Sequence, residues 1–130
     1  FLLKKEVLDQ VDPRNSYVKA TMKTAAGTLE NRFLLTEIGE FNEVKLPQAQ
    51  LSVRVIRPSD RLAAVEISSD RFAQDIMLSI QDTDVFYSDN GFCLDAGGTI
   101  TVSVRQEKEG LKGKRMRIVA HNSAPVTVIL

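Results

Sequence analysis

The stretch FYSDNGFCLDAGG, residues 86–98, decides the fold, because it places two tight turns around one very short strand. It predicts strands at Phe86 and Phe92, turns at Asp89-Asn90-Gly91 and Ala96-Gly97-Gly98, and a further strand over residues 99–105. Asp-Asn-Gly and Ala-Gly-Gly supply the positive φ angles that such turns require. Short strands separated by tight turns are typical of an all-β protein.

Alternation of apolar and polar residues continues this pattern along the chain. Strands are predicted to begin near Leu51, Leu62, Ala73, Phe92, Thr99, Arg115 and Val126. No segment holds a convincing helical stripe, and only residues 69–72 are expected to form a single helical turn. Seven short strands in roughly eighty residues are what an immunoglobulin-like β-sandwich needs.

The first part of the chain predicts a hairpin. Val18, Ala20 and Met22 share one face of a strand, and the turn at residues 25–27 leads into a partner strand over residues 29–35. Residues 37–50 lack clean alternation and indicate a long connection. Because two or three strands are too few for an independent core, we expect residues 1–46 to be the terminal strands of a preceding β-sandwich plus a linker. Residues 47–130 are then the immunoglobulin-like sandwich.

Composition narrows the function classes. The 130 residues include 17 Lys and Arg and 17 Asp and Glu, so the net charge of zero argues against nucleic-acid binding. A single cysteine excludes an intrachain disulfide, and no apolar run has the length of a membrane span or the pattern of a signal peptide. Position 1 is Phe and opens into an apolar stretch, so we expect a fragment of a longer polypeptide, with a processed mature protein as the alternative.

Four segments, taken in order, resemble one known family. They are the hairpin Gly27-Thr28-Leu29-Glu30-Asn31-Arg32-Phe33, the connector Val44-Lys45-Leu46-Pro47, the strand pair within residues 62–80, and Ser88-Asp89-Asn90. Together they are similar to the C-terminal β-sandwich region of the β-mannosidases among the family 2 glycoside hydrolases. The chain departs from the family's usual residues at Gly91, Cys93, Asp95 and Ala96. A related family 2 enzyme, such as an exo-glucosaminidase or a galactosidase-like hydrolase, therefore remains open.

The resemblance implies a parent enzyme that removes β-linked sugars from chain ends with retention of configuration. Such chemistry uses two carboxyl groups about 5 Å apart, and in this family both come from a (β/α)-barrel. No barrel fits in this chain, because strand–helix alternation is absent from the sequence. We therefore expect no catalytic, cofactor-binding or metal-binding residues in this segment, and an architectural role for it.

The sequence offers five candidate sites, and each has a structural alternative. Asn42-Glu43 matches the dipeptide that carries the family's acid/base glutamate, but it lies in the linker. Asp82, Asp84, Asp89 and Asn90 could supply oxygens to Ca²⁺, although loop acids more often cap turns. His121 is expected at a strand end, without a partner for a triad. Cys93 is expected to pack as a small apolar group.

The fifth candidate is the charged stretch 105–117, which holds Lys108, Lys112, Lys114, Arg115 and Arg117 along with Glu107 and Glu109. Mixed signs with Gly110 and Gly113 indicate a solvated hairpin loop, with an anion site as the alternative. A sugar-binding surface would need exposed aromatic residues, and the chain offers no Trp and only Tyr17 and Tyr87.

The sequence thus predicts a non-catalytic accessory domain of a retaining exo-acting glycosidase, β-mannosidase-like. Its expected partners are the other domains of the parent hydrolase, with a homodimer contact as a further candidate, and neither nucleic acid nor membrane. The resemblance implies a periplasmic or secreted bacterial protein, or a lysosomal one if the source is animal. The alternative is a stand-alone β-sandwich that acts as a binding or adhesion module.

Overall fold

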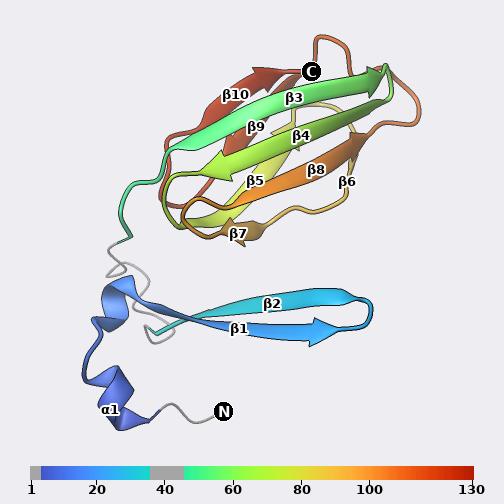
Figure 1. The fold of residues 1–130 in the computed structure, drawn as a ribbon. Helices are drawn as coiled ribbons and strands as arrows, with labels where there is room; N and C mark the ends of the chain where they lie inside the picture. The colour runs from blue at the N-terminus through green and yellow to red at the C-terminus, as the bar shows by residue number, and fades with distance from the viewer. Residues whose placement is uncertain (1–3, 36–45) are drawn as a thin grey trace. The chain divides into compact units, whose positions relative to one another are not determined.

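The computed structural model describes residues 4–35 and 46–130, and it divides the chain into two compact units. The first, residues 1–46, is called the hairpin unit here, and the second, residues 47–130, is called the sandwich. Both are built from antiparallel strands (Figure 1). The predicted all-β class is therefore confirmed.

The hairpin unit begins with a short helix, α1 (Lys5–Leu8), and a 3-10 turn, η1 (Pro13–Asn15). Strands β1 (Tyr17–Thr24) and β2 (Gly27–Leu34) then pair over their whole length. The hairpin confirms the alternation in the sequence, whereas the four-residue helix was not predicted. A helix this short carries no periodic signal, because it spans barely one turn.

One face of this hairpin is apolar and uncovered within the described part of the chain. The strand register places Val18 opposite Phe33 and Met22 opposite Leu29. Met22, Leu29 and Phe33 are each more than half exposed. The other face is polar, with Glu30 bound to Lys19 and to Arg32. A two-stranded sheet has nothing of its own to place against such a face.

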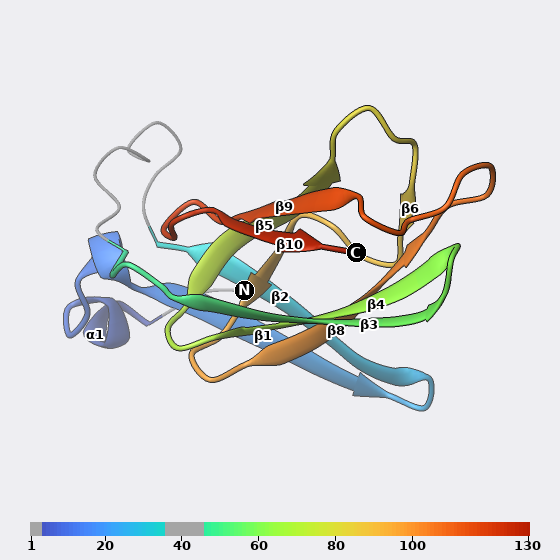
Figure 2. The same ribbon diagram turned by 90° about the horizontal axis from the view of Figure 1, so that it is seen from above.

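The sandwich consists of two four-stranded sheets, which Figure 2 shows as separate layers. The first sheet has the order β3 (Leu51–Ser59), β4 (Leu62–Ser69), β8 (Thr99–Arg105), β6 (Phe86–Tyr87). The second has the order β10 (Val126–Ile129), β9 (Arg115–Val119), β5 (Ala73–Ile80), β7 (Phe92–Leu94). All seven predicted strand starts are confirmed, and the strand expected at Phe86 is the two-residue β6.

The core lies between the two sheets and is made by the inward half of each alternating strand. Ile67, Val102, Ile76 and Ile118 have no exposed surface, and they come from strands of both sheets. Full burial of such a side chain contributes about 1.5–3 kcal/mol. The period-two pattern is thus explained by one buried face per strand.

The stretch 86–98 carries the chain from the first sheet to the second and back again. Ser88 lies beside β8, where its N–H donates to the Ser103 carbonyl and its Oγ accepts from the Ser103 N–H, both at 2.9 Å. Two residues later, Asn90 bonds to the second sheet. Its Oδ1 accepts from the Leu78 N–H at 2.8 Å, and its Nδ2 donates to the Leu78 carbonyl at 3.1 Å.

Two glycines in this stretch are required by geometry. Gly91 has φ +79°, and its N–H donates to the Ile76 carbonyl at 2.9 Å. Gly97 has φ +73° in the third position of the turn that the Gly98 N–H closes onto the Asp95 carbonyl. A side chain at either φ costs about 1–2 kcal/mol. Gly91 and Gly97 therefore adopt the positive φ angles that the sequence predicts for these two turns.

Two local expectations were wrong. Ser69 ends β4 and Asp70-Arg71 form a bend rather than a helical turn, with the Ser69 Oγ donating to the Arg71 carbonyl at 2.6 Å. The connection between β8 and β9 is not a hairpin loop, because those two strands belong to different sheets. It is also not wholly solvated. Leu111 is fully buried, and Gln106 is 5% exposed, with its Oε1 accepting from two backbone N–H groups, of Lys108 and Glu109.

Tyr87 gives a pH-dependent test of how the stretch 86–98 is placed. Its side chain turns inward against the core, while that of Phe86 turns outward. Burial raises the pKa of Tyr87 above its ordinary 10.0, and a hydrogen bond with the Ile80 backbone offsets part of that rise. The folded state therefore holds the phenolic proton more tightly. The stability contributed by this group is complete below about pH 10 and is lost as the pH rises through the folded pKa.

We expect Tyr87 to ionise later in the folded chain than in the unfolded chain. In a Tyr17→Phe variant Tyr87 is the only tyrosine, so phenolate absorbance followed against pH reports on it alone. The midpoint should lie above that of the same variant in denaturant. Coincident midpoints would show that Tyr87 does not face the core.

Candidate functional site

The acidic loop between β5 and β7 shows no reactive arrangement. Asp82, Asp84 and Asp89 are exposed, and the side chain of Asn90 is occupied by the backbone of Leu78. Among the described residues, no three His, Cys, Asp or Glu side chains are placed to hold a metal ion together. The structure therefore assigns Asn90 to the fold, where it replaces a missing stretch of strand beside β5.

The other sequence candidates do not converge either. Cys93 is half-buried in β7 as a free thiol. The exposed His121 uses its backbone N–H, which donates to the Gln74 carbonyl at 2.8 Å. Asn42-Glu43 lies outside the described residues. The described part of the chain thus brings no acid, base and nucleophile together.

A further polar arrangement surrounds Asn122, in the loop between β9 and β10. Its Nδ2 donates to the Pro47 carbonyl at 2.8 Å and to the Phe72 carbonyl at 2.7 Å. Its Oδ1 accepts from the Gln74 N–H at 3.0 Å. One side chain therefore joins the start of the sandwich, the bend between β4 and β5, and the loop between β9 and β10. We call this arrangement the Asn122 junction.

Backbone groups extend the Asn122 junction. The Ala49 N–H donates to the Asn122 carbonyl at 2.8 Å, and Ala49 forms a parallel bridge with Ser123. The Asp70 Oδ1 accepts from the Gln50 N–H at 2.7 Å, and the Asp70 N–H donates back to the Gln50 carbonyl at 3.3 Å. The segment entering the sandwich is therefore fixed on both sides before β3 begins.

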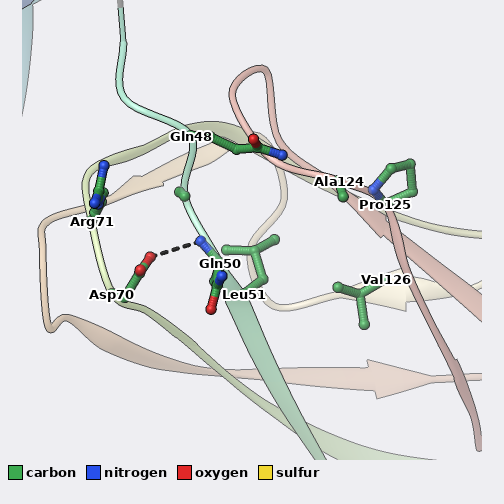
Figure 3. A pocket seen from close by; sticks show the side chains of 9 residues that line it. Gln48, Gln50, Leu51, Asp70, Arg71, Ala124, Pro125 and Val126 are labelled. Atoms are coloured by element: carbon green, nitrogen blue, oxygen red, sulfur yellow. Dashed lines mark hydrogen bonds between the residues drawn. The ribbon is translucent and has the colours of Figure 1, made fainter.

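A pocket of about 590 Å³ opens beside the junction, between the first residues of β3 and β10 (Figure 3). Figure 3 shows the Asp70 carboxylate directed at the Gln50 backbone, with Arg71 beyond it on the same bend. The described residues that line the pocket are Gln48, Ala49, Gln50, Leu51, Asp70, Arg71, Ala124, Pro125 and Val126.

This lining does not support glycoside hydrolysis. That reaction needs two carboxyl groups, about 5–5.5 Å apart in retaining enzymes and about 6.5–9.5 Å apart in inverting ones. Asp70 is the only carboxylic residue among the nine described lining residues, and its Oδ1 is already bonded to the Gln50 N–H. The remaining lining groups are amide, guanidinium and apolar side chains.

Asn122 is not among the candidate residues that the sequence analysis identified. A signal existed, because asparagine in loops often bonds to backbone groups in place of a turn. Its partners, however, lie 48, 50 and 75 residues away in the sequence. No local pattern specifies such partners.

The fold is an immunoglobulin-like β-sandwich. The side chains of Asn90 and Asn122 hold its connecting segments in place by bonding to the backbone. The chain belongs to the Ig_mannosidase family of Ig-fold domains, whose model matches residues 46–122. The matched range includes Asn90 and Asn122 themselves. Among curated proteins, none matches this chain.

We expect Asn122→Ala to lower the free energy of unfolding by about 2 kcal/mol, because three backbone groups lose their partner and two of those bonds are partly buried. Urea unfolding measures this loss. Ser123→Ala is the matched control, because the one hydrogen bond of the Ser123 Oγ to a described residue is to the adjacent Ala124 carbonyl. The control should lose less than about 0.5 kcal/mol. Equal losses in the two variants would remove Asn122 from its assigned role.

Proposed function

We propose that this chain is a non-catalytic accessory region of a larger retaining, exo-acting glycoside hydrolase, with β-mannosidase as the favoured parent activity. The observation that carries the proposal is the match to the mannosidase-type Ig-fold family over residues 46–122. The site geometry is consistent with it, because the polar residues within the matched range bond to the backbone of the sandwich itself. Catalysis would then belong to another part of the parent polypeptide.

The hairpin unit fits the same proposal. Its uncovered apolar face, which includes Met22, Leu29 and Phe33, requires a second sheet for burial. We propose that residues 1–46 end a preceding β-sandwich whose remaining strands cover this face. The partners of the chain are then the other domains of its own polypeptide. We propose a homodimer contact as a further partner.

We infer the cellular compartment only from the proposed parent enzyme. A bacterial enzyme of this class would be periplasmic or secreted, and an animal one lysosomal. No helix among the described residues is long and apolar enough to cross a membrane.

The alternative function, a stand-alone binding or adhesion module, draws support from one feature. Ile56, Leu62 and Phe86 are exposed on the outer face of the first sheet, and the Arg105 guanidinium lies 5.4 Å from the centre of the Phe86 ring. Exposed aromatic residues beside arginine are common in binding surfaces. A surface that grips sugar rings uses more flat aromatic area than this, and the adjacent Tyr87 faces the core.

The test is to purify the native polypeptide that carries this sequence, to measure its intact mass, and to assay it on a chromogenic β-mannoside beside the isolated 130-residue chain. We expect a mass many times 14.5 kDa, activity in the native polypeptide, and none in the isolated chain. A native mass near 14.5 kDa would favour the stand-alone module. Hydrolysis by the isolated chain itself would show that this segment is catalytic.

A further inference from the structure

Two arginines on the outer face of the first sheet are paired within the domain. On the first sheet, Arg54 bonds to both carboxylate oxygens of Glu66, at 3.1 and 3.2 Å. Arg105, on the same face, pairs with Glu107 at 3.5 Å and lies over the Phe86 ring. These two positive charges are therefore neutralised or stacked within the domain, whereas Arg57 and Arg61 of the β3–β4 region are exposed and form no ion pair with a described residue.

On the outer face of the second sheet, two arginines lie on the same strand. Arg115 and Arg117 lie on β9 with their side chains exposed on its outer face, while Met116 and Ile118 between and beyond them are buried. Neither arginine forms an ion pair with any described residue. Two residues along a strand separate their Cα atoms by about 7 Å, so two positive charges stand side by side, and neither has an ion-pair partner in the described ranges 4–35 and 46–130.

The neighbours of these arginines on the sheet are neutral or apolar. The strand register places Ile129 opposite Arg115, and Thr127 and Ser79 on either side of Arg117. One row further, Met77 lies opposite Val119. Ile129 is 66% exposed and Met77 is 46% exposed. We call the set of Met77, Ser79, Arg115, Arg117, Thr127 and Ile129 the arginine face.

The arginine face has the composition of a protein interface. Arginine and methionine are enriched where folded proteins meet, and apolar side chains surround the charged contacts there. Small residues such as Ser79 and Thr127 keep the sheet surface flat. Figure 2 shows that β10, β9 and β5 form one layer of the sandwich, so this face is directed away from the partner sheet.

We propose that the arginine face docks onto an acidic, partly apolar surface of another folded domain of the same polypeptide. Carboxylates on that surface bind Arg115 and Arg117, and apolar side chains cover Met77 and Ile129. Charge complementarity selects this occupant, because two adjacent unpaired arginines repel each other until an acidic partner arrives. The inference rests on the proposed function, which supplies the second domain.

The test is hydroxyl-radical oxidation of Met77, whose thioether is readily oxidised when solvent reaches it. The rate is measured in the isolated chain and in the native polypeptide, followed by peptide mass spectrometry. We expect Met77 to be oxidised about tenfold more slowly in the native polypeptide. The double variant R115E/R117E should restore the faster rate, because docked arginine–carboxylate pairs become repulsive.

The double variant R57E/R61E is the matched control. It changes the net charge by the same amount at exposed residues of the β3–β4 region, and it should leave Met77 protected. Equal Met77 rates in the isolated chain and the native polypeptide would overturn the proposal. Protection that survives R115E/R117E would overturn it as well, and so would protection that appears only on adding duplex DNA.

Failure of this inference is distinguishable from failure of the proposed function. A native mass near 14.5 kDa removes the second domain and defeats the proposed function before any oxidation is measured. A larger native polypeptide with unprotected Met77 leaves the proposed function intact and defeats only the docking of the arginine face.

Discussion

The sandwich depends on the pair of hydrogen bonds between the Asn90 side chain and the backbone of Leu78. The chain leaves the first sheet at Tyr87 and enters β7 of the second sheet at Phe92. In four residues it cannot form a regular strand in either sheet. The Asn90 amide supplies one acceptor and one donor to β5, as a neighbouring strand would. Ser88 does the same for β8 on the other side. Unpaired backbone groups of central strands would otherwise be costly.

Asn122 applies the same chemistry at the entry to the sandwich. Its amide satisfies three backbone groups that no sheet ladder reaches, one at Pro47 and two at Phe72 and Gln74. Asn90 and Asn122 therefore bond to backbone groups that a neighbouring strand would otherwise pair. Each occupies a position that could be mistaken for a binding site. This explains how a domain of the Ig_mannosidase family can carry conspicuous loop asparagines and acids without assembling a reactive centre among its described residues.

Sequence reasoning succeeded where structure is local. Alternation fixes which half of a strand is buried, and Asp-Asn-Gly and Ala-Gly-Gly fix turns, so the strand starts and the crossing stretch could be predicted. It failed where partners are distant or patterns too short. Residues 105–117 resembled a solvated hairpin, because nothing local shows that β8 and β9 belong to different sheets or that Leu111 is buried. The Asn122 junction and the unpaired state of Arg115 and Arg117 likewise required the three-dimensional arrangement.

Amide hydrogen exchange of Leu78 tests the central claim most directly. In β5 the N–H and carbonyl of Leu78 face Asn90, while those of its neighbour Ser79 face β9, because successive residues of a strand alternate. The account predicts that Asn90→Ala accelerates exchange at Leu78 by about tenfold more than at Ser79, since only Leu78 loses a bonded partner. Equal acceleration at both amides would mean that Asn90 affects stability only globally, and this would contradict the account.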